Sequence, residues 1–116
     1  ACGDELPVWS GNDDLTVPLL SLGAKGVISV LSNVRPKRTL QMVRACQAGD
    51  YAAAGRMQVA LTPLIDALFS EINPIPVKQA LSLMGIPAGL PRLPLTPLSA
   101  THLPALEQAL SAAPEP

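Results

Sequence analysis

The residue types that could carry out chemistry are few in this sequence. The single histidine, His102, falls at a predicted helix start, where a surface histidine is the ordinary interpretation, and the chain has no Ser-His-Asp order and no phosphate-binding loop. Lys25 and Lys78 could form an imine with a carbonyl compound, but such a lysine needs a desolvated pocket that lowers its pKa. Because Lys25 falls in a predicted turn and Lys78 on a short predicted helix, we expect both amines to be solvated. We therefore predict no catalytic residue within this chain.

Two groups of charged residues have an ordinary structural interpretation. Asp13 and Asp14 could be paired carboxylates, but their position before a predicted helix favours interaction with its unpaired N–H groups. The chain has 8 Lys and Arg against 9 Asp and Glu, a net charge of -1, so it has no field that would attract nucleic acid or an anionic membrane. The chain also has a local basic cluster, which we interpret as a solvated helix face. It consists of Arg35, Lys37, Arg38 and Arg44.

The two cysteines, Cys2 and Cys46, are far apart, and neither has a Cys or His nearby at metal-ligand spacing. We expect free thiols in a reducing cytoplasm, with a disulfide as the alternative.

No apolar run reaches the roughly 18 residues of a membrane span. The chain begins at Ala1 rather than Met and has no signal segment, so we expect a processed form or a piece of a longer protein.

Two short apolar segments, residues 6–10 and 26–30, predict buried strands. Residues 13–22 predict a helix between them, which ends at Gly23. Two strands separated by a helix form a βαβ unit, whose strands are parallel. Parallel strands are buried on both faces and hardly ever occur as an isolated pair, yet the sequence predicts no third strand downstream. The pattern therefore predicts that this chain is part of a larger fold.

The residues that could form a binding site follow these two strands. Gly11 and Asn12 come after the first strand, and Ser32 and Asn33 come after the second. In parallel α/β barrels, catalytic and binding residues lie at the carboxyl ends of the strands. Gly11 would let a ligand approach the backbone closely, and the two asparagines supply both donors and acceptors.

The remainder of the chain predicts helices and loops. Pro36 suits a first helical turn and Gly49 a helix end, and Asp50 is expected to cap the next helix. Pro63 should kink that helix. The helix carries an amphipathic stripe formed by Met57, Leu61, Leu64, Ile65 and Leu68.

Two shorter helices follow. The first is predicted to start at Pro76 and stop at Gly85, and the prolines between 87 and 97 predict an extended, stiff connector. Thr101 is expected to cap the last helix, and residues 112–116 are expected to fray.

Four segments lie in an order that points to a known family. They are residues 10–18, 23–33, 67–78 and 90–95, which read SGNDDLTVP, GAKGVISVLSN, ALFSEINPIPVK and LPRLPL. Together they resemble the C-terminal part of the dihydrodipicolinate synthase family, over nearly the whole chain. The related N-acetylneuraminate lyases usually differ at residues 26–30, which here follow the synthase pattern.

The resemblance implies an α/β fold, mostly helical by content. Residues 1–49 would form the last two βα units of a (β/α)8 TIM barrel, and residues 50–116 would form a C-terminal helical extension. Because a barrel alone needs about 250 residues, most of it would lie upstream of Ala1. The missing part would hold the family's imine-forming lysine, its proton-relay tyrosines, its threonine pair and its substrate-binding arginine.

The resemblance also implies a function in lysine and diaminopimelate biosynthesis. In this family, pyruvate forms an imine with the lysine, becomes an enamine and attacks L-aspartate 4-semialdehyde. Ile28 would line the pyruvate site through its main chain, and Gly11 and Asn12 would lie at the rim near the second substrate. The family often has Asp where this chain has Asn12, which weakens any charge-based role there.

The resemblance implies no metal or organic cofactor. The expected partners are pyruvate, L-aspartate 4-semialdehyde, the missing N-terminal barrel portion and further copies in a homo-oligomer, with no nucleic acid and no membrane. Two alternatives stay open: a stand-alone helical assembly module built on residues 50–112, or a fragment of a related pyruvate-dependent aldolase such as N-acetylneuraminate lyase. We expect no synthase activity from these 116 residues alone.

Overall fold

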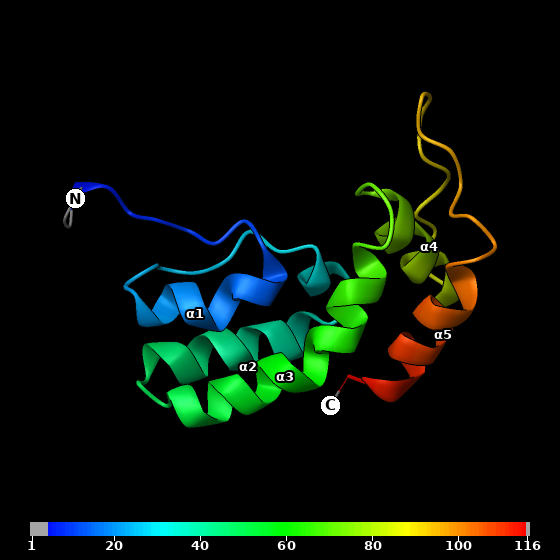
Figure 1. The fold of residues 1–116 in the computed structure, drawn as a ribbon. Coiled ribbons are helices and arrows are strands. Elements are labelled where there is room, and N and C mark those ends of the chain that lie inside the picture. The colour runs from blue at the N-terminus through cyan, green and yellow to red at the C-terminus, as the bar shows by residue number, and fades with distance from the viewer. Residues whose placement is uncertain (1–4, 116) are drawn as a thin grey trace.

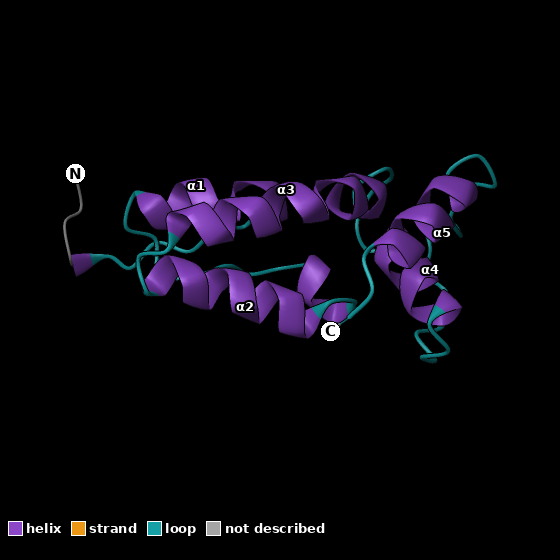
Figure 2. Ribbon diagram, turned by 90° about the horizontal axis from the view of Figure 1, so that it is seen from below, coloured by secondary structure: helices purple, strands orange, loops and turns teal. Residues whose placement is uncertain are grey.

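The computed structural model describes residues 5–115, which form helices joined by turns and loops (Figures 1 and 2). Two one-turn 3-10 helices, η2 and η3, precede α1 and α2. In chain order the elements are η2 (Asp13–Leu15), α1 (Thr16–Ser21), η3 (Leu31–Asn33), α2 (Pro36–Gln47), α3 (Tyr51–Leu68), α4 (Ile75–Leu83) and α5 (Leu103–Ala112). Helices α1, α2 and α3 lie side by side, and α4 and α5 pack at the far end of α3 (Figure 1).

The prediction of two strands is wrong for the described residues, where no strand forms (Figure 2). The two segments instead run extended and side by side, joined by one parallel bridge between Ser10 and Val27 (Figure 1). Backbone hydrogen bonds of 2.8 Å join Lys25 N to Val8 O, Ser10 N to Gly26 O, and Ile28 N to Ser10 O. The parallel direction agrees with the predicted βαβ unit, but a sheet needs further strands on the outer edges of this pair.

The same segments are also less buried than predicted. Val8, Trp9 and Ile28 are exposed, whereas Ser10 between them is fully buried. The chain has a radius of gyration of 15.1 Å, against about 13 Å for a compact domain of 100 residues. An extended outline with an uncovered apolar edge is what part of a larger fold would leave.

The local signals for α2 and α3 are confirmed. Helix α2 begins at Pro36, and Gly49 follows its end with a φ of 82°. The Asp50 carboxylate accepts a hydrogen bond of 2.9 Å from the Ala53 N–H and so caps α3. Helix α3 continues through Pro63, and Figure 1 shows its last turns bending away from the direction of its first turns.

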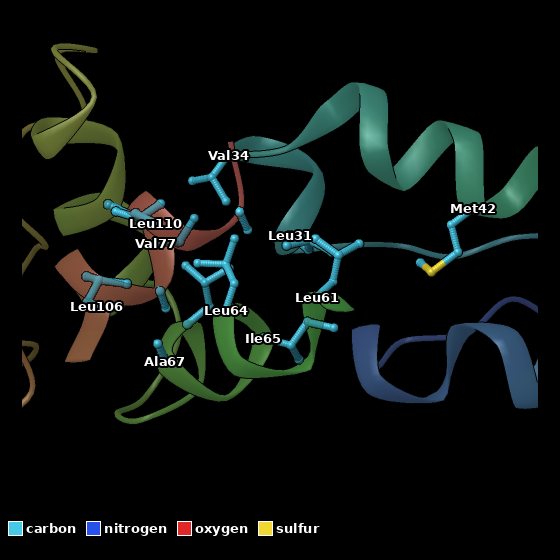
Figure 3. Packing of buried hydrophobic residues seen from close by; sticks show 14 residues of the cluster. Leu31, Val34, Met42, Leu61, Leu64, Ile65, Ala67, Val77, Leu106 and Leu110 are labelled. Atoms are coloured by element: carbon cyan, nitrogen blue, oxygen red, sulfur yellow. The ribbon is translucent and has the colours of Figure 1, made fainter. Parts of the chain in front are cut away.

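One main core cluster holds these helices together (Figure 3). The predicted stripe on α3 supplies its centre, with Leu61, Leu64, Ile65 and Leu68 buried and Met57 partly buried. The cluster also contains Leu31, Val34, Met42, Val77, Leu106 and Leu110 from η3, α2, α4, α5 and the turn after η3. Side chains from both sides of Gly49 share this core, and the division into residues 1–49 and 50–116 stays a prediction.

The C-terminal end differs from its prediction. Thr101 does not cap α5: the residue at that position is His102, which makes no side-chain cap hydrogen bond. Residues 113–115 are not frayed. Ala113 is buried, its carbonyl accepts a hydrogen bond from Arg35 Nε, and the Pro114 carbonyl accepts one from Arg38 Nε.

Arg35 is therefore not part of a solvated basic face. It is only 6% exposed, and its Nη2 donates a hydrogen bond of 2.7 Å to the carbonyl of Leu110, near the end of α5. Burial lowers the pKa of this guanidinium, while Glu115 acts in the opposite direction. Because the last carbonyls of a helix have no partner within the helix, a buried cation there satisfies them.

Candidate functional site

The ends of the two extended segments meet at one place in the structure. The Ile28 N–H donates to the carbonyl of Ser10, the residue before Gly11, over 2.8 Å. Ile28 is 71% exposed and Gly11 is also exposed, so both lie on an open surface. Two of the three residues predicted for the substrate site are thus brought together by the backbone.

Asn12, the third residue predicted for the site, turns toward α3. The buried Ser10 hydroxyl donates to the Asn12 carbonyl at 2.7 Å and accepts from the Asn12 N–H at 3.2 Å, which fixes the turn between them. Asn12 lines a cavity of about 200 Å³. The other residues around this cavity are Asp14, Ile65, Asp66 and Phe69.

Asp13 has a role that the sequence did not predict. The sequence favoured a carboxylate near the start of its own helix, but no side chain caps η2 or α1. Asp13 is instead 1% exposed, and its Oδ2 accepts hydrogen bonds from the Val30 N–H at 2.9 Å and the Leu31 N–H at 3.0 Å. Its Oδ1 accepts a hydrogen bond from the Ser29 hydroxyl. The carboxylate therefore caps the turn that follows the second extended segment.

Gln58 on α3 extends the same network and was also missed. Its Nε2 donates to the Asp13 carbonyl at 3.0 Å, and its Oε1 accepts from the Val17 N–H at 3.3 Å. Gln58 is 8% exposed, so its amide is buried against residues 10–15, which we call the first loop. The only signal in the sequence is a glutamine beside the apolar stripe of α3, where a buried polar group needs partners.

The turn after the second segment is also held by hydrogen bonds from its own side chains. The Ser29 hydroxyl accepts from the Ser32 N–H at 2.8 Å, and Ser32 Oγ donates to the Ser29 carbonyl at 3.1 Å. Asn33 Nδ2 donates to the Val30 carbonyl at 3.0 Å. The amide of Asn33, a candidate for ligand binding, therefore contacts the turn itself.

The other titratable candidates lie in ordinary surroundings. Lys25 is exposed, as expected, but Lys78 is partly buried and donates to the Ala88 carbonyl. His102 lies 3.9 Å from Glu71, whose pKa is lowered by hydrogen bonds from the Ser99 hydroxyl and N–H.

Cys46 is a free, buried thiol whose pKa is raised by burial, and Cys2 lies outside the described residues. Between residues 5 and 115, no three His, Cys, Asp or Glu side chains are grouped so that they could hold a metal ion. None of the helices in this range is both long enough and apolar enough to cross a membrane.

Comparisons with known proteins agree with the resemblance seen in the sequence. A family model for the dihydrodipicolinate synthetase family matches residues 1–113. The 4-hydroxy-tetrahydrodipicolinate synthase of Acetivibrio thermocellus is 47% identical over 109 residues, which are 94% of this chain and 37% of that protein. The synthase of Methanocaldococcus jannaschii is 49% identical over 106 residues, covering 91% of this chain and 37% of that protein.

Solved structures give the same result. Dihydrodipicolinate synthase from Thermotoga maritima matches with a TM-score of 0.89 at 44% identity, over 94% of this chain and 37% of that chain. A chloride-inhibited synthase from Acinetobacter baumannii, complexed with pyruvate, matches with a TM-score of 0.88 at 40% identity, over 93% of this chain and 37% of that chain. A synthase described as the first monomeric variant matches with a TM-score of 0.88 at 45% identity, over 95% of this chain and 37% of that chain. The chain spans about 37% of the length of these relatives, and it belongs to the dihydrodipicolinate synthetase family.

Proposed function

We propose that the chain is the C-terminal part of a cytoplasmic 4-hydroxy-tetrahydrodipicolinate synthase. The complete enzyme would be a Schiff-base lyase that condenses pyruvate with L-aspartate 4-semialdehyde in lysine and diaminopimelate biosynthesis. The observation that carries the proposal is the pairing of the two loop ends, where the Ile28 N–H meets the Ser10 carbonyl beside Gly11. The relatives' shared name and the neighbour with bound pyruvate support the same reaction.

In this proposal the two extended segments are the last two strands of a (β/α)8 barrel. Their parallel bridge and their exposed apolar side chains support this assignment, because barrel strands need neighbours on both edges. The site then lies at the carboxyl ends of these strands, where such barrels bind their substrates.

The chain would supply one wall of the site, and the imine-forming lysine would come from the missing N-terminal portion. Ile28 would line the pyruvate position through its main chain, while Gly11 and Asn12 would lie at the rim. Imine formation makes the bound pyruvate acidic next to the C=N group, so the chemistry needs no metal or organic cofactor. The homo-oligomer we propose is supported by a neighbour described as a monomeric variant, which implies that monomers are unusual in this family.

Borohydride reduction in the presence of pyruvate, followed by intact-mass measurement, tests this proposal. The complete enzyme should gain one reduced pyruvate adduct per subunit on a lysine upstream of Ala1, and these 116 residues alone should gain none. An adduct on Lys25 or Lys78 would contradict the proposal. A second assay distinguishes a synthase from an N-acetylneuraminate lyase. The complete enzyme without borohydride should condense pyruvate with L-aspartate 4-semialdehyde but not with N-acetylmannosamine.

A further inference from the structure

We propose that Asp13 is a positioning residue that holds Ile28 in place by clamping the second loop, residues 28–33, onto the first loop, residues 10–15. This inference rests on the proposed function, since Ile28 matters for activity only if its main chain lines the pyruvate position. Asp13 itself would not touch the substrate, because its carboxylate is buried and surrounded by three donors from the second loop.

The bonds at Asp13 match what an ionised carboxylate offers. Such a group accepts hydrogen bonds and donates none, and it forms stronger bonds than a neutral acceptor does. The Ser29 hydroxyl, the Val30 N–H and the Leu31 N–H all donate to it. An amide at position 13 would have the same shape but would turn an N–H group toward at least one of these donors.

These bonds close a ring around Ile28. The Ile28 N–H is fixed to the Ser10 carbonyl on one side, and two residues later the Val30 N–H is fixed to the Asp13 carboxylate. The second loop is thus held to the first both at Ile28 itself and at the three residues that follow it. Without the Asp13 bonds, only the backbone hydrogen bonds that precede residue 29 would set the position of Ile28 relative to Gly11.

Gln58 anchors this ring to the helical part of the molecule. Its amide bonds the Asp13 carbonyl on the first loop and the Val17 N–H in α1, so the loop and the helix that follows it are each fixed to α3 at one point. The position of Asp13 therefore depends on α3, and the position of Ile28 depends on Asp13. This order predicts that a change at Gln58 has the same kind of effect as a change at Asp13, with a smaller size.

Asp13→Asn in the complete enzyme tests the clamp through two readouts. Hydrogen exchange of the unliganded enzyme should speed up at residues 28–31 by about tenfold or more, since the amide keeps only one acceptor oxygen, loses the negative charge and leaves at least one of the three donors without an acceptor. The KM for pyruvate should rise by about tenfold or more, while a role confined to stability would lower the melting temperature and leave the KM of the folded enzyme unchanged. Asp50→Asn is the matched control, because it removes a charge at a helix start far along the chain and leaves an asparagine that caps equally well.

Ser29 gives a second pair of variants in case Asp13→Asn does not fold. Ser29→Ala removes one of the three bonds and should raise the KM for pyruvate by severalfold, whereas Ser29→Thr keeps the hydroxyl and should stay near the wild type. In the double variant of Asp13→Asn with Ser29→Ala, the effects should be smaller than their product, because both act through one bond.

The exchange rates and the pyruvate kinetics together decide whether the clamp exists and whether it positions Ile28. Unchanged exchange at residues 28–31 in Asp13→Asn or Ser29→Ala overturns the clamp. Faster exchange with a wild-type KM and kcat for pyruvate shows that the clamp is structural only, which overturns its positioning role. A wild-type complete enzyme that forms no imine with pyruvate overturns the proposed function instead, and the exchange data still decide whether the clamp exists.

Discussion

The guanidinium of Arg35 donates a hydrogen bond of 2.7 Å to the carbonyl of Leu110, which joins the start of α2 to the end of α5. The same side chain donates to the carbonyls of Val34 and Ala113. A single buried cation therefore satisfies carbonyls from two segments that lie 75 or more residues apart. This contact ties the C-terminal helix α5 to the turn between η3 and α2.

The first prediction concerns this contact. Arg35→Ala should lower the free energy of unfolding of the chain by about 2–4 kcal/mol, because buried carbonyls lose their donors. Arg56→Ala is the control, since Arg56 is an exposed arginine on α3 and should cost less than about 0.5 kcal/mol. Urea denaturation of the three proteins measures both values, and equal midpoints would show that Arg35 contributes no stability.

The second prediction concerns which part of the isolated chain is most firmly folded. Leu64 is buried in the main core inside α3, whereas Ile28 is exposed and its N–H bonds only across a two-segment bridge. Hydrogen exchange of these 116 residues should therefore show Ile28 less protected than Leu64. The reverse order would mean that the extended pair finds partners by self-association.

The third prediction uses Gly26, which faces the ring of Trp9. A Cβ built at Gly26 would lie 2.5 Å from Trp9 Cζ3, so Gly26→Ala must displace the ring. Because Trp9 is half exposed, it can move, and we expect a cost of about 1 kcal/mol together with a shift in tryptophan emission. Trp9 is the only tryptophan in the chain, so the emission reports on this contact alone.

Gly55 provides the control for the third prediction. It lies inside α3, and a Cβ at that position would meet no atom within 4 Å. Gly55→Ala should therefore stabilise the chain by about 0.5–1 kcal/mol and leave the emission unchanged. If Gly26→Ala behaves like Gly55→Ala, the ring does not pack on Gly26.

The elements that the sequence predicts well are those with local signals. Pro36 and Gly49 mark the ends of α2, and Asp50 caps α3, because each acts on backbone groups only a few residues away. The strands were mispredicted since a strand depends on neighbours, and the described residues supply only one bridge.

The site network was harder to predict because its bonds join distant residues. Asp13 reaches Val30 and Leu31, 17 and 18 residues later, and Gln58 reaches Asp13 across 45 residues. Neither composition nor spacing shows which of the two acids, Asp13 or Asp14, turns inward. The buried Arg35 was missed for the same reason, since its partners lie at the other end of the chain.

The last prediction compares the two residues that the backbone brings together at the proposed site. Gly11 has no neighbouring atom within 4 Å of a Cβ built on it, and its φ is not in the left-handed region, so nothing within this chain requires a glycine there. Gly11→Val in the complete enzyme should therefore change the melting temperature little. It should lower kcat/KM for pyruvate by much more than tenfold if the glycine lets the substrate approach.

Ile28→Val is the matched comparison for Gly11→Val. If Ile28 acts through its main chain, this change should lower kcat/KM by less than about tenfold, or about 1.4 kcal/mol of barrier. Its side chain is exposed in this chain, so in these 116 residues the loss of one methylene should cost little stability. Steady-state kinetics and melting curves of both variants decide the matter: normal pyruvate kinetics for Gly11→Val with a lower melting temperature would make the glycine structural and remove it from the proposed pocket.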